Sequence, residues 1–233
     1  MKDRIAIPLH DHGGKLVGYA GRVVDETLIS DENPRYRFPS GRERDGIYYD
    51  FQKGLFLYNG YFLANDGGNL AEIIVCESFT AVWWLTQWGF PHVVGLMGAN
   101  CSREQGELIA ALTSTDGVVT ILTDGDDAGI RCAVSIFTEV APRRPVKWTK
   151  LPSGTQPTDC SKTELGALSE SNLSQKALKN RKYPGGAAQN PAQLRHDSQQ
   201  IDATLSKVIA AWPKVNADTR RRVVNLISRD AHS

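Results

Sequence analysis

Short apolar runs alternate with helix-like segments between residue 70 and about residue 160. The apolar runs predict four buried strands, at residues 73–76, 93–96, 118–122 and 146–151. Helices are predicted between them, at residues 79–88, from Ser102 onwards with Gln105 completing a capping box, and at residues 128–140. Strands that alternate with helices favour a parallel sheet covered on both faces. We therefore predict an α/β domain with a four-stranded, mainly parallel sheet and flanking helices.

The segments on either side of this region follow different patterns. Residues 4–24 alternate apolar and polar positions around a Gly13-Gly14 turn, which predicts a β-hairpin. Residues 25–50 are polar and predict an irregular loop, whereas the Pro, Gly and Asn residues of 180–196 indicate a linker. We predict three parts, namely a small β-rich subdomain at 1–65, the α/β domain at 66–165, and a linker with a basic helical tail at 166–233.

Charge is distributed unevenly along the chain. The net charge is +1, but the last 59 residues carry +7 and the preceding 174 carry −6. A basic tail suggests an anionic partner, although a solvated tail would show the same charge. The four cysteines include no CxxC pair, so a structural zinc site is not predicted. No apolar run is long enough to span a bilayer, and we expect a soluble, cytoplasmic protein without a membrane partner.

Three carboxylates follow the strand predicted at residues 118–122. Asp124 and Asp126 point to the same side of an extended backbone, just beyond the strand end where ligands bind in open α/β sheets. They are therefore candidate ligands for Mg²⁺, which typically takes one or two carboxylates and keeps several waters. The alternative is a simple Asp-Gly turn before a helix, and Asp127 fits a helix cap well. Glu77 follows the first strand and could face this cluster across the strand ends.

The order of these acidic residues resembles a known family. A Glu after the first strand and an Asp-x-Asp after the third are similar to the Toprim signature, shared by bacterial DnaG-type primases, topoisomerases, and some nucleases and recombination proteins. The run from Asp124 to Gly129 resembles primases in particular. The segments at residues 4–22, 34–36 and 51–59 resemble the part of DnaG-type primases that precedes their Toprim domain.

The resemblance implies a role for each candidate residue. Glu77, Asp124 and Asp126 would be catalytic and would hold Mg²⁺ or Mn²⁺, with Asp159 as a further metal ligand. The residues implied to contact nucleic-acid phosphates are Arg22, Arg35 and Lys53, while the other arginines near them fit ordinary surface charge. The implied activity is that of a DNA primase, a nucleotidyltransferase of DNA replication that transfers ribonucleotides on a single-stranded DNA template. A separate zinc-finger or helicase subunit would be a further partner.

Some features depart from the primase pattern and leave alternatives open. Ser78 stands where primases usually carry Gly, and Ala81 stands where they often carry an acidic residue. The resemblance starts inside the primase core, so we expect the zinc-binding domain to be lacking. A Toprim nuclease would use the same acidic cluster, and a truncated primase remnant would bind nucleic acid without catalysis. The retained Glu77, Asp124 and Asp126 favour an enzyme, and the primase-like segment before them favours a primase over a nuclease.

Overall fold

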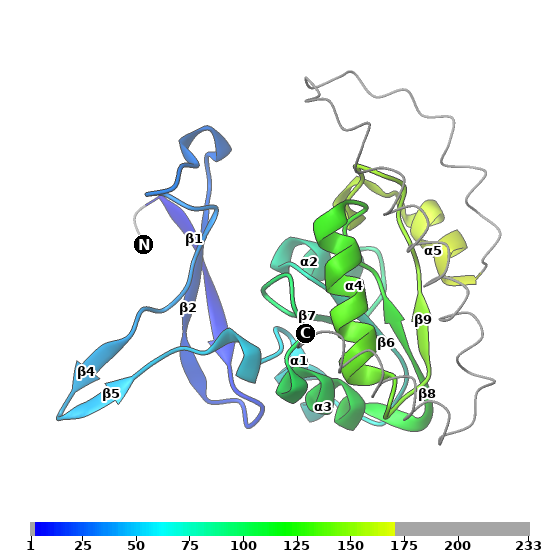
Figure 1. Ribbon diagram of the computed structural model, residues 1–233, viewed down its shortest axis with the longest axis horizontal. Coiled ribbons are helices and arrows are strands. Elements are labelled where there is room, and N and C mark those ends of the chain that lie inside the picture. Colours follow the sequence, from blue (N-terminus) through cyan, green and yellow to red (C-terminus); the bar gives the residue numbers. More distant parts are fainter. Residues whose placement is uncertain (1–2, 171–233) are drawn as a thin grey trace, which may run out of the picture.

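A computed structural model of the chain describes residues 3–170. Its N-terminal part contains an antiparallel sheet in which β1 (Arg4–His10) pairs with β2 (Leu16–Val23) and β2 pairs with β3 (Tyr36–Arg37). A second hairpin, formed by β4 (Arg42–Arg44) and β5 (Ile47–Tyr49), projects away from the rest of the protein (Figure 1). Most of the linker and tail predicted at residues 166–233 lies outside the described residues.

The N-terminal hairpin was predicted correctly, but the segment after it is more ordered than its composition suggested. In β1, Ile7 and Leu9 are buried whereas Ile5 is exposed, so the alternation identifies the face that packs inward. Residues 25–50 were predicted as an irregular loop, and this is wrong in part. They contain the short helix η1 (Glu26–Leu28) as well as β3 and the β4–β5 hairpin. These short elements contain few apolar positions, so periodicity does not reveal them.

The second part of the protein is built on the predicted four-stranded sheet. Its strand order is β7 (Val93–Gly95), β6 (Leu70–Cys76), β8 (Thr113–Ile121) and β9 (Val146–Trp148), and all three pairings are parallel. β8 begins earlier than predicted because polar residues 113–117 continue the strand beside Leu70, where the register shifts. The prediction of a four-stranded, parallel α/β sheet is confirmed.

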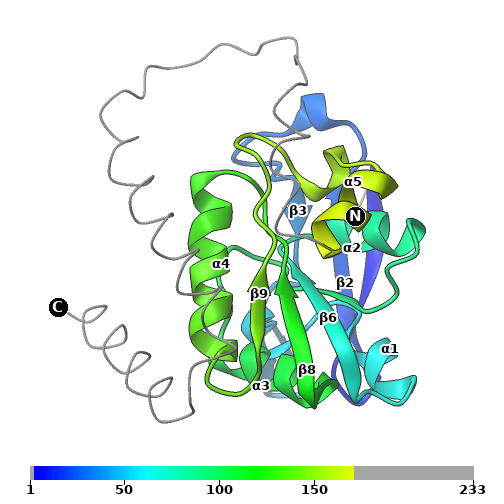
Figure 2. The ribbon, with the colours of Figure 1, turned by 90° about the vertical axis from the view of Figure 1, so that its right-hand side faces the viewer.

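Helices cover both faces of this sheet, as Figure 2 shows. Alternate residues of β6 serve the two faces: Ile73 and Val75 join one core with α3 and α4, whereas Ile74 and Cys76 join another with α2 and α5. This division explains why the strand is apolar at every position in its second half. The helical elements are η2 (Lys53–Leu55), α1 (Gly60–Asn65), α2 (Phe79–Gln87), α3 (Arg103–Leu112), α4 (Asp127–Val140), η3 (Pro157–Asp159) and α5 (Lys162–Glu170).

A third core joins the N-terminal sheet to the α/β domain. Ile7, Leu9 and Ala20 of the N-terminal hairpin pack with Phe79 of α2 and with Met97, which follows β7. Phe79 is only two residues from Glu77, so this contact fixes the antiparallel sheet beside the acidic candidates. Within residues 3–170, no helix combines the length and the hydrophobicity that a membrane span requires.

Candidate functional site

The candidate carboxylates lie where the chain leaves the sheet in opposite directions. β6 and β8 are neighbouring parallel strands, but the chain runs from β6 to β7 at one edge and from β8 to β9 at the other. In open α/β sheets, ligands bind beyond the strand ends at such a divergence. Glu77 follows β6 directly and Asp124 lies three residues beyond β8. The Asp124 backbone N–H donates a hydrogen bond of 3.1 Å to Oε1 of Glu77, so the two strand ends are joined at this point.

Local structure fixes each side of this junction. Ser78 is the N-cap of α2, and its hydroxyl accepts a 3.2 Å hydrogen bond from the Ala81 N–H. Glu77 is therefore held between the end of a buried strand and the start of a helix. On the other side, the Gly125 N–H donates to the carbonyl of Thr155 at 2.8 Å, and the Gly154 N–H donates to the carbonyl of Gly125 at 2.8 Å.

The structure corrects the prediction that Asp127 caps the helix after this loop. Asp126, not Asp127, is the N-cap of α4, and its Oδ1 accepts a 2.7 Å hydrogen bond from the Gly129 N–H. Asp127 lies in the first helical turn with an exposed side chain. The sequence does not separate the two residues, because either carboxylate would be stabilised near the helix N-terminus. Asp126 is thus partly engaged by the helix, although its side chain remains exposed to solvent.

Burial, with a contribution from mutual repulsion, raises the pKa values of two of the acidic side chains. Burial raises the pKa of Glu77 to about 7. The hydrogen bond from the Asp124 N–H lowers this pKa, whereas the negative charges of Asp124 and Asp126 raise it further. Burial also raises the pKa of Asp124 to about 6, with further contributions from Asp126 and Asp159, while the positive charge of Arg35 opposes the rise. Burial and repulsion therefore both disfavour the charged forms of Glu77 and Asp124, and a bound divalent cation would relieve this.

The raised pKa of Glu77 predicts that the stability of the metal-free protein falls as the pH rises. A raised carboxyl pKa gives stability that is complete below the ordinary value of 4.5 and is lost as the pH rises through about 7. With EDTA present at pH 8, Glu77→Gln should therefore be more stable than the unsubstituted protein by about 1–2 kcal/mol, after allowance for partial exposure. The gap should largely close by pH 5. Urea unfolding across this range measures it, and Glu43→Gln, which removes an exposed carboxylate, should show no such gap.

Asp159 lies close enough to raise the pKa of Asp124, but it is engaged in its own turn. Its Oδ2 accepts a 2.8 Å hydrogen bond from the Gln156 N–H, and its side chain is exposed. Within residues 3–170, no three His, Cys, Asp or Glu side chains stand close enough together to hold a metal ion. The carboxylates nevertheless fit Mg²⁺, because that ion is commonly held by one or two carboxylates and otherwise by water. Glu77 and Asp124 are the residues best placed to hold it.

The three candidate basic residues do not form one cluster. Arg22 on β2 and Arg35 just before β3 both form ion pairs with Glu26, at 2.6 and 3.7 Å. Lys53 lies apart from them, with its Nζ 4.9 Å from the ring centroid of Phe38 and beside Gly98. Sequence reasoning missed Glu26, for which the spacing of four residues from Arg22 was the only signal. The pairing with Arg35 depends on the antiparallel contact between β2 and β3.

Comparison with known proteins agrees with this arrangement. Residues 71–152 match the Toprim domain family. The DNA primase of Deinococcus radiodurans is 31% identical over 161 residues, which cover 68% of this chain and 26% of that primase. The solved Aquifex aeolicus primase, with its zinc-binding and RNA polymerase domains, is 26% identical with a TM-score of 0.56, covering 71% of this chain and 39% of that one. A DnaG primase catalytic domain bound to ssDNA is 25% identical with a TM-score of 0.56, covering 72% of this chain and 51% of that one.

The match has a definite extent. The chain spans about a quarter of the length of the curated primases that it matches. The residues that match the Toprim family, 71–152, include Glu77 and Asp124 at the ends of their strands. This chain is therefore a homologue of bacterial DNA primases over about two thirds of its length, and it contains a Toprim domain like that of the DnaG catalytic core.

Proposed function

We propose that this chain catalyses ribonucleotide transfer on a single-stranded DNA template, as a DNA primase dependent on Mg²⁺ or Mn²⁺. The observation that carries the proposal is the junction of Glu77 and Asp124 at the point where the sheet connections diverge. Homology to DNA primases supports the reaction class, and a solved relative bound to ssDNA supports the template class. The proposal places the protein in the cytoplasm with replicating DNA, where a zinc-finger or helicase subunit is a further expected partner.

Each proposed residue has a distinct role in this reaction. In nucleotidyl transfer, a 3′-hydroxyl oxygen bonds to the α-phosphorus of a ribonucleoside triphosphate, the bond to pyrophosphate breaks and the hydroxyl proton is lost. As an alternative to binding the metal, Glu77 would accept that proton, for which its pKa of about 7 in the metal-free protein is suited. Glu77, Asp124 and Asp126, with Asp159 as a further ligand, would hold the Mg²⁺ that neutralises charge on the phosphate oxygens. Arg22, Arg35 and Lys53 would contact phosphates of the template or the nucleotide.

Two alternative functions compete with this proposal. A Toprim nuclease would use the same carboxylates to cleave a phosphodiester instead of forming one. A non-catalytic module that only binds nucleic acid is favoured by the hydrogen bonds that engage Asp126 and Asp159 within their own turns. Similarity to DNA primases covers 68% of the chain, which is more than the Toprim residues 71–152 alone, and this favours a primase over a nuclease.

One assay separates these three functions. The purified chain is incubated with an end-labelled single-stranded template, ribonucleotides and MgCl₂, and both RNA products and template fragments are followed. RNA products support the primase proposal, whereas template fragments support a nuclease. Binding of the template without either product, even after a primase zinc-binding domain is added in trans, would contradict the proposal and leave the non-catalytic module. A parallel reaction with MnCl₂ tests whether the carboxylates accept either metal.

A further inference from the structure

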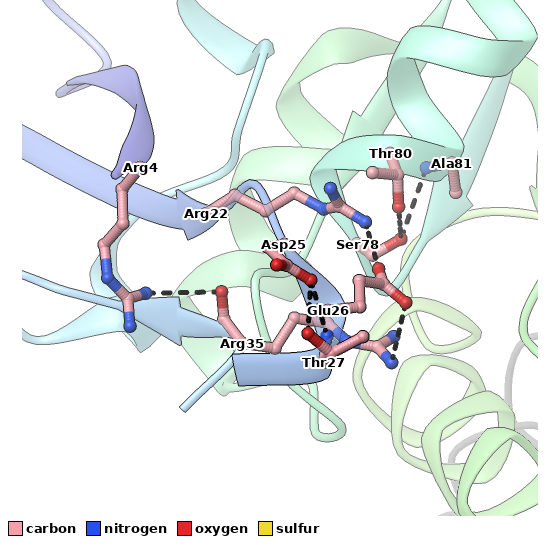
Figure 3. A network of polar contacts seen from close by, with 9 residues as sticks. All are labelled: Arg4, Arg22, Asp25, Glu26, Thr27, Arg35, Ser78, Thr80 and Ala81. Carbon is pink, nitrogen blue, oxygen red and sulfur yellow. Dashed lines mark hydrogen bonds and ion pairs between the residues drawn. The ribbon is translucent and has the colours of Figure 1, made fainter. Parts of the chain in front are cut away.

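The loop between β2 and β3 places one acidic side chain against two of the candidate phosphate-binding arginines. Arg22 Nη2 donates to Glu26 Oε1 at 2.6 Å, and Arg35 Nη2 lies 3.7 Å from Glu26 Oε2. The two guanidinium groups come from different segments of the antiparallel sheet, and both approach the same carboxylate (Figure 3). We call this group the Glu26 clamp, meaning Arg22, Arg35 and Glu26 together.

Contacts outside the clamp determine its backbone geometry. Asp25 caps η1, because its Oδ1 accepts hydrogen bonds from the Thr27 N–H at 3.0 Å and from the Thr27 hydroxyl at 2.6 Å. Arg4 fixes the other end of the loop, donating to the carbonyls of Gly21 and Pro34 at 2.9 Å each and to the side chain of Asn33. The loop therefore has its own supports, and replacing the Glu26 carboxylate leaves these contacts in place.

The side chains of the Glu26 clamp are partly exposed, and Glu26 does not accept from every donor of the two arginines. The Glu26 and Arg35 side chains are 50% and 49% exposed, whereas that of Arg22 is only 20% exposed. The Nε of Arg22 is buried, and it has no hydrogen-bond partner among the described residues. A buried guanidinium nitrogen without an acceptor is costly, and a phosphate offers more acceptor oxygens than one carboxylate does. Exposed ion pairs are also weak, so an anionic ligand can displace Glu26.

The clamp borders the acidic cluster described above. Burial raises the pKa of Asp124 and the positive charge of Arg35 opposes that rise, so this guanidinium lies within electrostatic range of the candidate metal site. An anion bound between Arg22 and Arg35 would thus lie within electrostatic range of Asp124. While Glu26 occupies this position, its negative charge offsets one of the two guanidinium charges and reduces the attraction for an approaching phosphate.

We propose that Glu26 occupies a phosphate site, and that a phosphate of single-stranded nucleic acid replaces its carboxylate between Arg22 and Arg35. This inference rests on the proposed function, because it assumes that the two arginines bind nucleic acid. Glu26 then lowers the affinity of the free protein and makes binding an exchange of one anion for another. Its removal should expose two cations that the phosphate backbone can use.

The test compares two glutamates of the same loop. Glu26→Gln removes the carboxylate from the clamp, whereas Glu32→Gln removes an exposed carboxylate that has no described contact with either arginine. Binding of a fluorescent single-stranded oligonucleotide is measured by anisotropy over a range of NaCl concentrations. We expect Glu26→Gln to bind about three- to tenfold more tightly at low salt and with a steeper salt dependence. Glu32→Gln should change the affinity by less than about twofold.

A double-variant background shows whether the gain acts through the arginines. With both Arg22 and Arg35 replaced by alanine, adding Glu26→Gln should raise the oligonucleotide affinity by no more than Glu32→Gln does. An equal effect of the two glutamine substitutions in the native background would overturn the proposal, and so would weaker binding by Glu26→Gln, because Glu26 would then be ordering the arginines. If the unsubstituted chain binds the oligonucleotide in those cases, the proposed function stands without this inference. If neither it nor Glu26→Gln binds, both proposals fail.

Discussion

Replacing Asp124 by alanine should abolish metal-dependent catalysis while preserving the binding of single-stranded DNA. Asp124 joins the end of β8 to Glu77, and its side chain interacts with the charges of Glu77, Asp126 and Asp159. Its removal takes away one of the two carboxylates best placed to hold Mg²⁺, so the affinity for that ion should fall by more than about tenfold. Product formation should fall by at least about 100-fold, because the metal stabilises the charge that develops on the phosphates.

Binding measurements distinguish this loss from general damage to the protein. Calorimetric titration with MgCl₂ reports the metal, and oligonucleotide anisotropy reports the nucleic acid. DNA binding should stay unchanged or strengthen, because the substitution removes a negative charge near Arg35. Asp127→Ala is the matched control, since it removes an exposed carboxylate only three residues away. Equal loss of Mg²⁺ affinity in both variants would contradict the assignment of Asp124 to the metal site.

The parallel sheet could be predicted because its strands are apolar on both faces. Ile73 to Cys76 supply two different cores, and this requirement produces a continuous apolar run that is visible in the sequence. The same pattern located the candidate site, since the acidic residues come directly after two such runs. The β4–β5 hairpin could not be predicted, because every residue in it is exposed and no core imposes a period on the sequence.

The roles of individual side chains were harder to predict than the position of the site. Asp126 and Asp127 are adjacent, and only the backbone angles at the start of α4 decide which of them accepts the Gly129 N–H. The pairing of Glu26 with Arg35 depends on how the loop between β2 and β3 folds back. These contacts are made by polar groups on the surface, where hydrophobic patterning carries no information.

Replacing Gly129 by alanine should destabilise the protein severely, because the loop that carries Asp124 passes directly over this position. A Cβ at Gly129 would overlap the carbonyl oxygen of Asp124 and would lie 2.7 Å from its carbonyl carbon and 3.0 Å from its nitrogen. All of these atoms belong to the backbone, so no side-chain rotation can relieve the overlap. Either α4 must move away from the loop or the loop must move away from Glu77. We expect a loss of about 2–4 kcal/mol in the free energy of unfolding, together with weaker Mg²⁺ binding.

Gly166→Ala provides the matched control for this prediction, since it is the same substitution in another helix. A Cβ at Gly166 would meet no atom within 4 Å. Alanine is the better helix former by about 1 kcal/mol, so this variant should be as stable as the unsubstituted protein or more so. Urea unfolding of the two variants gives opposite signs if backbone contact is the cause. A Gly129→Ala protein within about 0.5 kcal/mol of the unsubstituted chain would show that α4 does not hold the Asp124 loop, because substitutions without such contact fall in that range.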